Sequence, residues 1–146
     1  MKIKNYTSGI SVEKSVMLIE KTLVEVGATH IAKVYDNNKD LAGITFQIQT
    51  NGMPLVFRLP SKWKEYTKLL ERKIKKPHRG TIERIREQSK RTAWKLLLEW
   101  VQIQVSMIQL QQAEIIEVFL PYAYDMNKDE TFFDKLKGTQ FKQLTQ

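Results

Sequence analysis

Residues 44–59 read ITFQIQTNGMPLVFRL, and this stretch decides the fold. From Ile44 to Ile48, apolar and polar residues alternate, which is typical of a strand with one buried and one exposed face. Asn51-Gly52 follows, a dipeptide strongly favoured in the two-residue turn of a β-hairpin. From Leu55 to Leu59 the alternation resumes with its apolar residues at odd positions. The stretch therefore predicts two antiparallel strands joined by a tight turn.

The residues upstream add a helix and a third strand. Ser11 is a favourable N-cap for a helix whose apolar residues recur every three or four positions, and Gly27 is suited to end that helix. Ala28–Tyr35 is rich in β-branched and aromatic residues, which favours a strand. We also expect a short strand at Lys2–Tyr6. The prediction for residues 1–60 is an α+β unit, with an N-terminal helix packed on a three-stranded antiparallel meander.

Residues 61–124 form the mainly helical part of the predicted fold. Ser61 and Thr81 are favourable N-caps for two helices. From Thr81 to Phe119 the chain contains neither Gly nor Pro, which predicts one long helix over this range. Val101–Val105 alternates like a strand, but its place inside this long stretch favours helix.

Length and composition fit one folded domain spanning residues 1–146. Of the residues, 42% are hydrophobic and 27% are charged, close to the average of globular domains. Residues 125–146 predict a weak helix and a frayed tail. The chain has no apolar run of the roughly 20 residues that a membrane helix needs, no secretory signal and no cysteine. We therefore expect a cytoplasmic protein.

The net charge of +8 is concentrated in one segment. Residues 62–95 contain 13 Lys and Arg but only 4 Asp and Glu. Because a Lys or Arg beside a phosphate releases condensed counterions, such a segment can follow a nucleic-acid backbone. The alternatives are a solvated helix face with local ion pairs and a surface for an acidic protein. The candidate phosphate contacts lie in a loop around residues 75–80 and at helical spacing beyond it: Lys75, Lys76, Arg79, Arg84, Arg91 and Lys95.

Two further residues are candidate base contacts. Trp63 lies between two lysines, an arrangement found in proteins that stack aromatic rings on bases, although packing in the core explains this residue as well. Arg58 belongs to the polar face of the meander, where ordinary solvent exposure is the alternative. These residues do not indicate whether the nucleic acid would be single- or double-stranded.

The breadth of the apolar surface on the long helix predicts a homo-oligomer. Beyond Ala93 the apolar side chains fill an arc of roughly 240°, which is more than short neighbouring elements readily cover. Gln104 and Gln111 lie within this arc, and a pair of amides across an interface would fix its register. Hydrogen bonding within the chain is the alternative. The predicted oligomer interface comprises Leu97, Val101, Gln104, Ile108 and Gln111.

Enzyme motifs are largely missing from the sequence. His30 and His78 are far apart, and no HExxH, phosphate-binding loop or dinucleotide fingerprint is present. Asp125–Asp129 resembles the start of a calcium loop but lacks the glycine that such a loop requires. We therefore expect no catalysis, no cofactor and no metal.

Several strings in the chain carry a family resemblance. Arg91–Lys95, Trp100–Gln104, Met107-Ile108 and Glu117–Tyr122, together with Phe57–Pro60, resemble a family of small uncharacterised proteins of bacteriophages, prophages and related mobile elements. The resemblance implies a bacterial host cell and a gene neighbourhood of early DNA replication and recombination. It favours a non-catalytic DNA-binding accessory protein, with DNA preferred over RNA. The alternative is a small interaction protein that inhibits or modulates a host or phage protein by occluding its surface.

Overall fold

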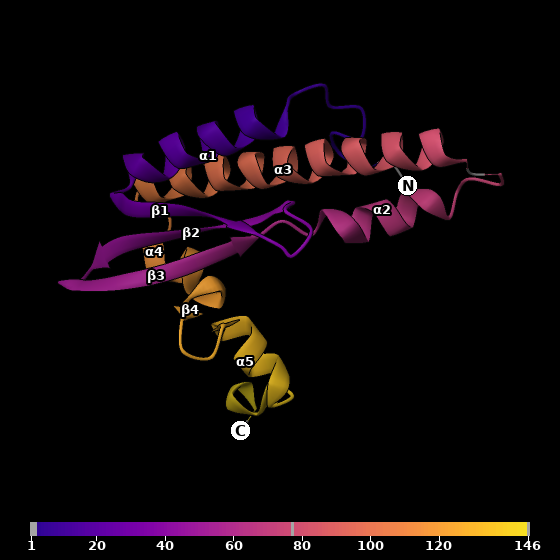
Figure 1. Cartoon of the computed structure of the whole chain (residues 1–146). Helices are drawn as coiled ribbons and strands as arrows, with labels where there is room; N and C mark the ends of the chain where they lie inside the picture. Colours follow the sequence, from indigo (N-terminus) through magenta and orange to yellow (C-terminus); the bar gives the residue numbers. More distant parts are fainter. Residues whose placement is uncertain (1–2, 77, 146) are drawn as a thin grey trace. The chain divides into compact units, whose positions relative to one another are not determined.

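A computed structural model describes residues 3–76 and 78–145 of the chain (Figure 1). It confirms the α+β class: an N-terminal helix, a three-stranded antiparallel sheet, and a mainly helical second half with one long helix. The elements in order are α1 (Val12–Glu25), β1 (Ala28–Tyr35), β2 (Leu41–Thr50), β3 (Met53–Pro60), α2 (Trp63–Glu71), α3 (Arg79–Gln109), α4 (Ile115–Phe119), the 3-10 turn η1 (Leu120–Tyr122), β4 (Tyr124–Asp125), β5 (Glu130–Thr131), α5 (Phe132–Gly138) and the 3-10 turn η2 (Lys142–Leu144).

The chain divides into two compact units. We call residues 1–22 and 61–103 the helical unit, and residues 23–60 and 104–146 the sheet unit. Helices α1 and α3 each contribute residues to both units. Each unit contains fully buried apolar side chains, among them Trp94 and Leu98 in the helical unit and Phe46 and Leu59 in the sheet unit.

The sheet has the predicted meander order β1-β2-β3, with both pairs antiparallel. Thr50 pairs with Met53 across the Asn51-Gly52 turn, whose φ angles of 53° and 79° are those that this dipeptide readily adopts. Two prolines, Pro54 and Pro60, lie on β3, an edge strand of the sheet. An edge strand tolerates proline at positions whose N–H would point away from the neighbouring strand.

An aromatic cluster forms the centre of the sheet unit. Phe46 of β2, Phe57 of β3 and Phe119 of α4 are all buried, with ring centroids 5.3 to 5.7 Å apart. At Gly43 of β2 a Cβ atom would lie 2.7 Å from the carbonyl oxygen of Leu59, so β2 and β3 approach too closely there for any other residue. Close packing of this kind fixes the position of α4 within the unit.

Of the three predicted N-caps, only Ser11 is confirmed. Its Oγ accepts a hydrogen bond from the Lys14 N–H at 3.1 Å. Ser61 does not cap α2, because Lys62 occupies the cap position. Thr81 lies inside α3, since the Ile82 N–H bonds to the carbonyl of His78 and the helix starts two residues earlier than predicted.

The long helix is shorter than the sequence predicts. It ends at Gln109, and Gln111 adopts the left-handed conformation with φ of 60° that glycine usually supplies at a helix end. Helix α4 then begins at Ile115, where the Glu117 carboxylate accepts a hydrogen bond from the Glu114 N–H. Val101–Val105 lies within α3, as favoured from the sequence.

Candidate nucleic-acid interface

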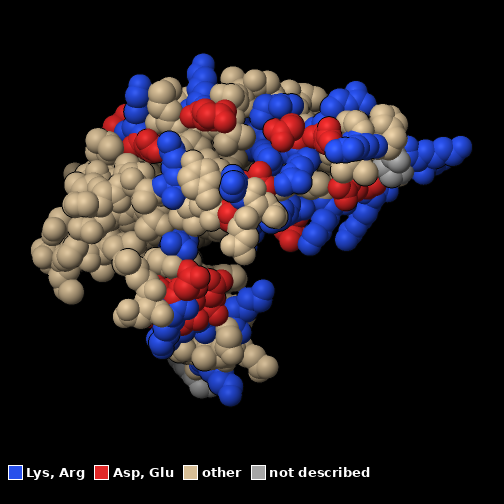
Figure 2. Space-filling view, viewed as in Figure 1, with Lys and Arg blue, Asp and Glu red and all other residues tan. Residues whose placement is uncertain are grey.

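The positive charge of the protein belongs to one of its two units. The helical unit contains 17 Lys and Arg against 7 Asp and Glu, a net charge of +10, whereas the sheet unit contains 7 against 9, a net charge of −2. Figure 2 shows Lys and Arg gathered over α2 and the start of α3. An anionic partner would therefore be attracted to the helical unit.

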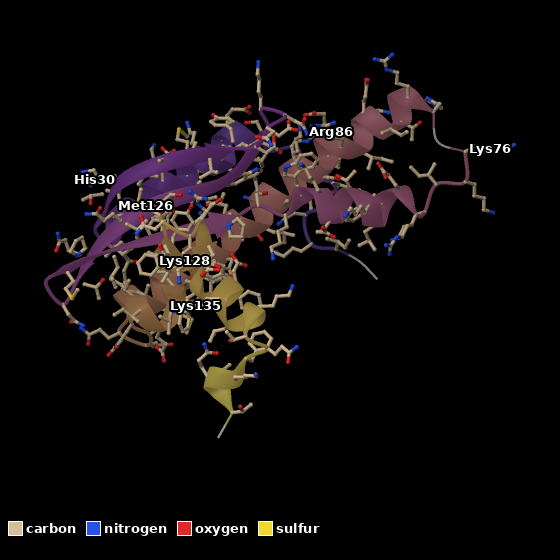
Figure 3. The ribbon with its side chains drawn as sticks, turned by 60° about the horizontal axis from the view of Figure 1, so that its bottom comes forward. His30, Lys76, Arg86, Met126, Lys128 and Lys135 are labelled. Carbon is tan, nitrogen blue, oxygen red and sulfur yellow. The ribbon has the colours of Figure 1, made fainter. Side chains whose placement is uncertain are left out.

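Helix α2 and the first part of α3 form a helical hairpin within this unit. The two helices lie side by side in Figures 1 and 3. The ring of Trp63 in α2 faces the cationic groups of Arg86 and Lys90 in α3, 5.3 and 5.0 Å from its centroid. Lys76 stands at the far tip of the hairpin, in the connection between the helices (Figure 3).

Five cations surround this tip, and we call them the tip cluster: Arg72, Lys73, Lys75, Lys76 and Arg79. They fall within eight residues that contain no acid, and all five are exposed. The first four make no ion pair or side-chain hydrogen bond with any residue that the structure describes. Arg79 pairs with Glu83 at 3.4 Å, but both side chains are largely exposed, at 94% and 66%. Such a surface pair is weak.

Beyond the tip, the predicted row of cations on α3 separates into two parts. Arg84 is exposed and, among the described residues, unpaired. Arg91 is half-buried: its Nε donates to the Ser8 carbonyl at 3.2 Å and its Nη2 to Gln88 Oε1 at 2.7 Å. Lys95 is half-buried as well. Arg84 is therefore, like the tip cluster, available to an anionic ligand. Arg91 instead holds the N-terminal segment through its bond to Ser8.

That N-terminal segment forms turns where a strand was predicted at Lys2–Tyr6, of which Lys2 lies outside the described residues. The prediction is wrong because the segment bonds to α3 rather than to a neighbouring strand. Asn5 donates to the Glu99 carboxylate at 3.0 Å, and Lys4 pairs with it at 3.3 Å. Burial alone would raise the pKa of Glu99, but these two hydrogen bonds and the charges of Lys4 and Lys95 bring the pKa below its ordinary value.

Trp63 is a core residue rather than a stacking surface. Only 4% of it is exposed. Three cations from the protein itself lie over its ring, those of Lys64, Arg86 and Lys90, at 5.0 to 5.6 Å from the centroid. The ring therefore offers no free face to a base, and the core alternative for this residue is the one that the structure supports.

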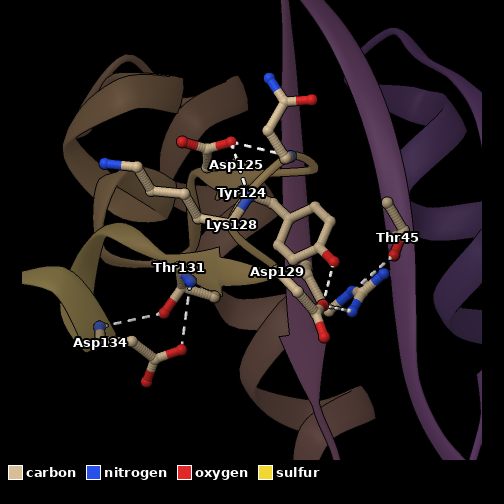
Figure 4. A network of polar contacts seen from close by, with 9 residues as sticks. Thr45, Tyr124, Asp125, Lys128, Asp129, Thr131 and Asp134 are labelled. Atoms are coloured by element: carbon tan, nitrogen blue, oxygen red, sulfur yellow. Dashed lines mark hydrogen bonds and ion pairs between the residues drawn. The ribbon is translucent and has the colours of Figure 1, made fainter.

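Arg58 likewise makes its contacts within the sheet unit, with the Thr45, Tyr124 and Asp129 that are labelled in Figure 4. Its Nε donates to Thr45 Oγ1 and its Nη1 to Asp129 Oδ1, both at 3.1 Å, and its guanidinium lies 3.8 Å from the centroid of the Tyr124 ring. The Tyr124 hydroxyl also bonds to Asp129, and this bond, with burial, raises the pKa of the phenol. These contacts give Arg58 a structural role within the sheet unit, and its role as a base contact stays a prediction.

The residues of the predicted oligomer interface do not share one exposed face. Val101 is fully buried in the single chain. Leu97, Gln104 and Ile108 are half-buried. Gln111 is exposed but lies beyond the end of α3, in the left-handed turn.

The sheet unit carries a shallow groove of about 540 Å³ with mainly apolar walls. One wall is the start of β3, and the other runs from β4 to α5. The lining residues are Pro54, Leu55, Val56, Ala123, Tyr124, Asp125, Met126, Glu130, Thr131, Phe132 and Lys135. Sequence reasoning missed this groove, because its walls come from segments about 70 residues apart.

Within residues 3–76 and 78–145, no three His, Cys, Asp or Glu side chains come together in a group that could hold a metal ion. In the same part of the chain, no helix is both long and apolar enough to cross a bilayer. No family model matches the chain, and no curated protein or solved structure shows significant similarity to it.

Proposed function

We propose that this protein binds nucleic acid without catalysing a reaction on it, and that it does so through the tip cluster and Arg84. The observation that carries the proposal is the tip cluster itself: five exposed cations within eight residues, with no acid among them, on a unit of net charge +10. Ion pairs on the surface do not neutralise this excess of positive charge, because Glu83 is the one acid that pairs with the cluster among the described residues.

Binding would follow from electrostatics and counterion release. Each tip cation that approaches a phosphate displaces condensed counterions, and arginine can additionally form paired hydrogen bonds to phosphate oxygens. Arg79 can exchange its exposed carboxylate partner for a phosphate at little cost, because the existing pair is solvated. The connection between α2 and α3 carries four of these cations, among them the Lys76 labelled in Figure 3, and Arg79 begins α3.

The resemblance in sequence supplies the biological setting of the proposal. It supports an accessory role in the replication or recombination of phage or mobile-element DNA, in the cytoplasm of a bacterial host. DNA is accordingly the preferred ligand over RNA.

The proposal is tested by fluorescence anisotropy with labelled DNA of about 30 nucleotides at low salt, single- and double-stranded. The test variant carries Lys73→Gln, Lys75→Gln and Lys76→Gln. The matched control carries Lys128→Gln, Lys137→Gln and Lys142→Gln, three exposed lysines of the sheet unit, so both lose the same charge.

We expect the tip variant to lose about tenfold or more in affinity, and the control to lose about twofold or less. If both variants lost the same affinity, the loss would follow from net charge alone, and the tip cluster could not be assigned as the binding site. Absence of binding by the unmodified protein would overturn the proposal.

The groove of the sheet unit favours a second candidate function, occlusion of another protein's surface. Apolar grooves with a charged rim are common at protein interaction sites. Met126 lines the groove and is 75% exposed, so Met126→Asp changes the groove at little expense to the fold. Co-purification of a defined protein from infected cells that is lost with Met126→Asp and retained by the tip variant would support this function. Co-purification that is unaffected by Met126→Asp would count against it.

A further inference from the structure

The hairpin that carries the tip cluster presents no exposed Phe, Tyr or Trp ring in its described part. Its exposed imidazole, that of His78, shares a hydrogen bond of 2.9 Å with Thr81 Oγ1. Trp63 is 4% exposed and Trp94 is fully buried. Tyr66 is half-buried. Among the Phe, Tyr and Trp residues of the described helical unit, Tyr6 is the one that is exposed, at 49%, and it belongs to the N-terminal segment rather than to the hairpin.

This distribution bears on the kind of nucleic acid that fits. Proteins that bind single strands combine cations with aromatic rings on which unpaired bases stack, a contribution of about 1–3 kcal/mol per base. The stretch that holds the tip cluster has the cations and one imidazole, that of His78, but no Phe, Tyr or Trp. A duplex, by contrast, keeps its bases stacked inside and offers phosphates of both strands on its surface, about one charge per 1.7 Å of axis.

The hairpin also lacks a free side-chain amide for reading base edges. Gln88 is the one Asn or Gln between residues 61 and 95. Its Nε2 donates to the Ser8 carbonyl and to Thr92 Oγ1, and its Oε1 accepts from Arg91. A bidentate amide is the usual reader of adenine, and Arg or Lys is the usual reader of guanine. The described hairpin offers Arg and Lys without a free amide, and because these cations bind phosphate on any sequence, we expect contacts to phosphate to dominate.

We propose that the ligand of the tip cluster is double-stranded nucleic acid, held by its phosphate backbone without preference for base sequence. This inference rests on the proposed function and narrows it. It assigns the tip cations to phosphates alone and leaves stacking and base readout without a role.

A competition experiment tests it with the full chain. A complex with a labelled duplex of about 30 base pairs is challenged with unlabelled competitors: two duplexes of unrelated sequence and the separated strands of each. We expect the two duplexes to compete equally within about twofold, and the single strands to compete about tenfold less well at equal nucleotide concentration. Tyr6→Ala should leave duplex affinity unchanged.

Single strands that compete as well as duplexes, or a loss of binding in Tyr6→Ala, would overturn the duplex assignment and leave nucleic-acid binding intact. One duplex that competes far better than the other would overturn the absence of sequence preference. If the protein bound no nucleic acid at all, no complex with the labelled duplex would form, and this result would overturn the proposed function itself.

Discussion

Replacing Arg58 by Gln separates a structural role for this residue from a role in binding. The substitution removes the ion pair with Asp129, the contact with the Tyr124 ring and the hydrogen bond to Thr45. The ion pair contributes about 0.5 kcal/mol, because Asp129 is 77% exposed. The ring contact contributes about 0.5–1 kcal/mol and the hydrogen bond about 1 kcal/mol.

The expected cost of Arg58→Gln is therefore about 2 kcal/mol of unfolding free energy, or a fall of roughly 5–8 °C in melting temperature for a chain of this length. Urea unfolding measures it directly. A double-mutant cycle with Asp129→Asn should return a coupling energy of about 0.5 kcal/mol, the share of the ion pair. Affinity for DNA should match that of Lys128→Gln, an exposed single-charge control in the same unit.

The opposite pattern would refute this reasoning. Unchanged stability, together with a loss of DNA affinity clearly larger than in Lys128→Gln, would make Arg58 a base or phosphate contact, as its place on the polar face of the meander suggests. The pairing with Asp129 would then be incidental.

Two more outcomes are expected. Val101→Asp should unfold the protein or cost several kcal/mol, because the side chain is fully buried; a folded variant whose mass by light scattering falls relative to the unmodified protein would instead place Val101 between two copies. Glu99→Gln should be less stable than the unmodified protein above about pH 5 in urea titrations. Since the folded-state pKa of Glu99 lies below its ordinary 4.5, its contribution is present above that value and is lost as the pH falls through the folded-state pKa. A difference that stays constant down to pH 2 would contradict the ionised role of the carboxylate.

The meander could be predicted from the sequence because its determinants are local. Strand alternation and the Asn51-Gly52 turn act over a few residues, and the register Thr50↔Met53 follows from the turn. The Ser11 cap and the helix end at Gly27 are local in the same sense; Gly27 has a φ of 96°. These elements therefore appear where the sequence indicates them.

The end of the long helix could not be predicted in this way. Gln111 adopts a conformation that glycine normally supplies, and no composition rule marks it. The pair Glu114 and Glu117, three residues apart, is the one local signal that a new helix starts there.

The candidate site could be predicted only in part, for a related reason. Lys75, Lys76, Arg79 and Arg84 belong to a surface that the local run of charge already indicates. Arg91 does not, because its partner Ser8 lies 83 residues away in sequence. The partner of Arg58, Asp129, lies 71 residues away. Long-range partners of this kind leave no trace in sequence spacing.

The salt dependence of DNA binding tests most directly whether the tip cluster contacts phosphates. Six duplex phosphate contacts, from the tip cluster and Arg84, predict a slope of about −5.4 in a plot of log K against log salt, at about −0.9 per contact. Lys73→Gln, Lys75→Gln and Lys76→Gln together should reduce that slope to about −2.7, and the charge-matched control in the sheet unit should leave it unchanged. A tip variant that retains the full slope would contradict the assignment, because the neutralised phosphates would then lie against another part of the protein.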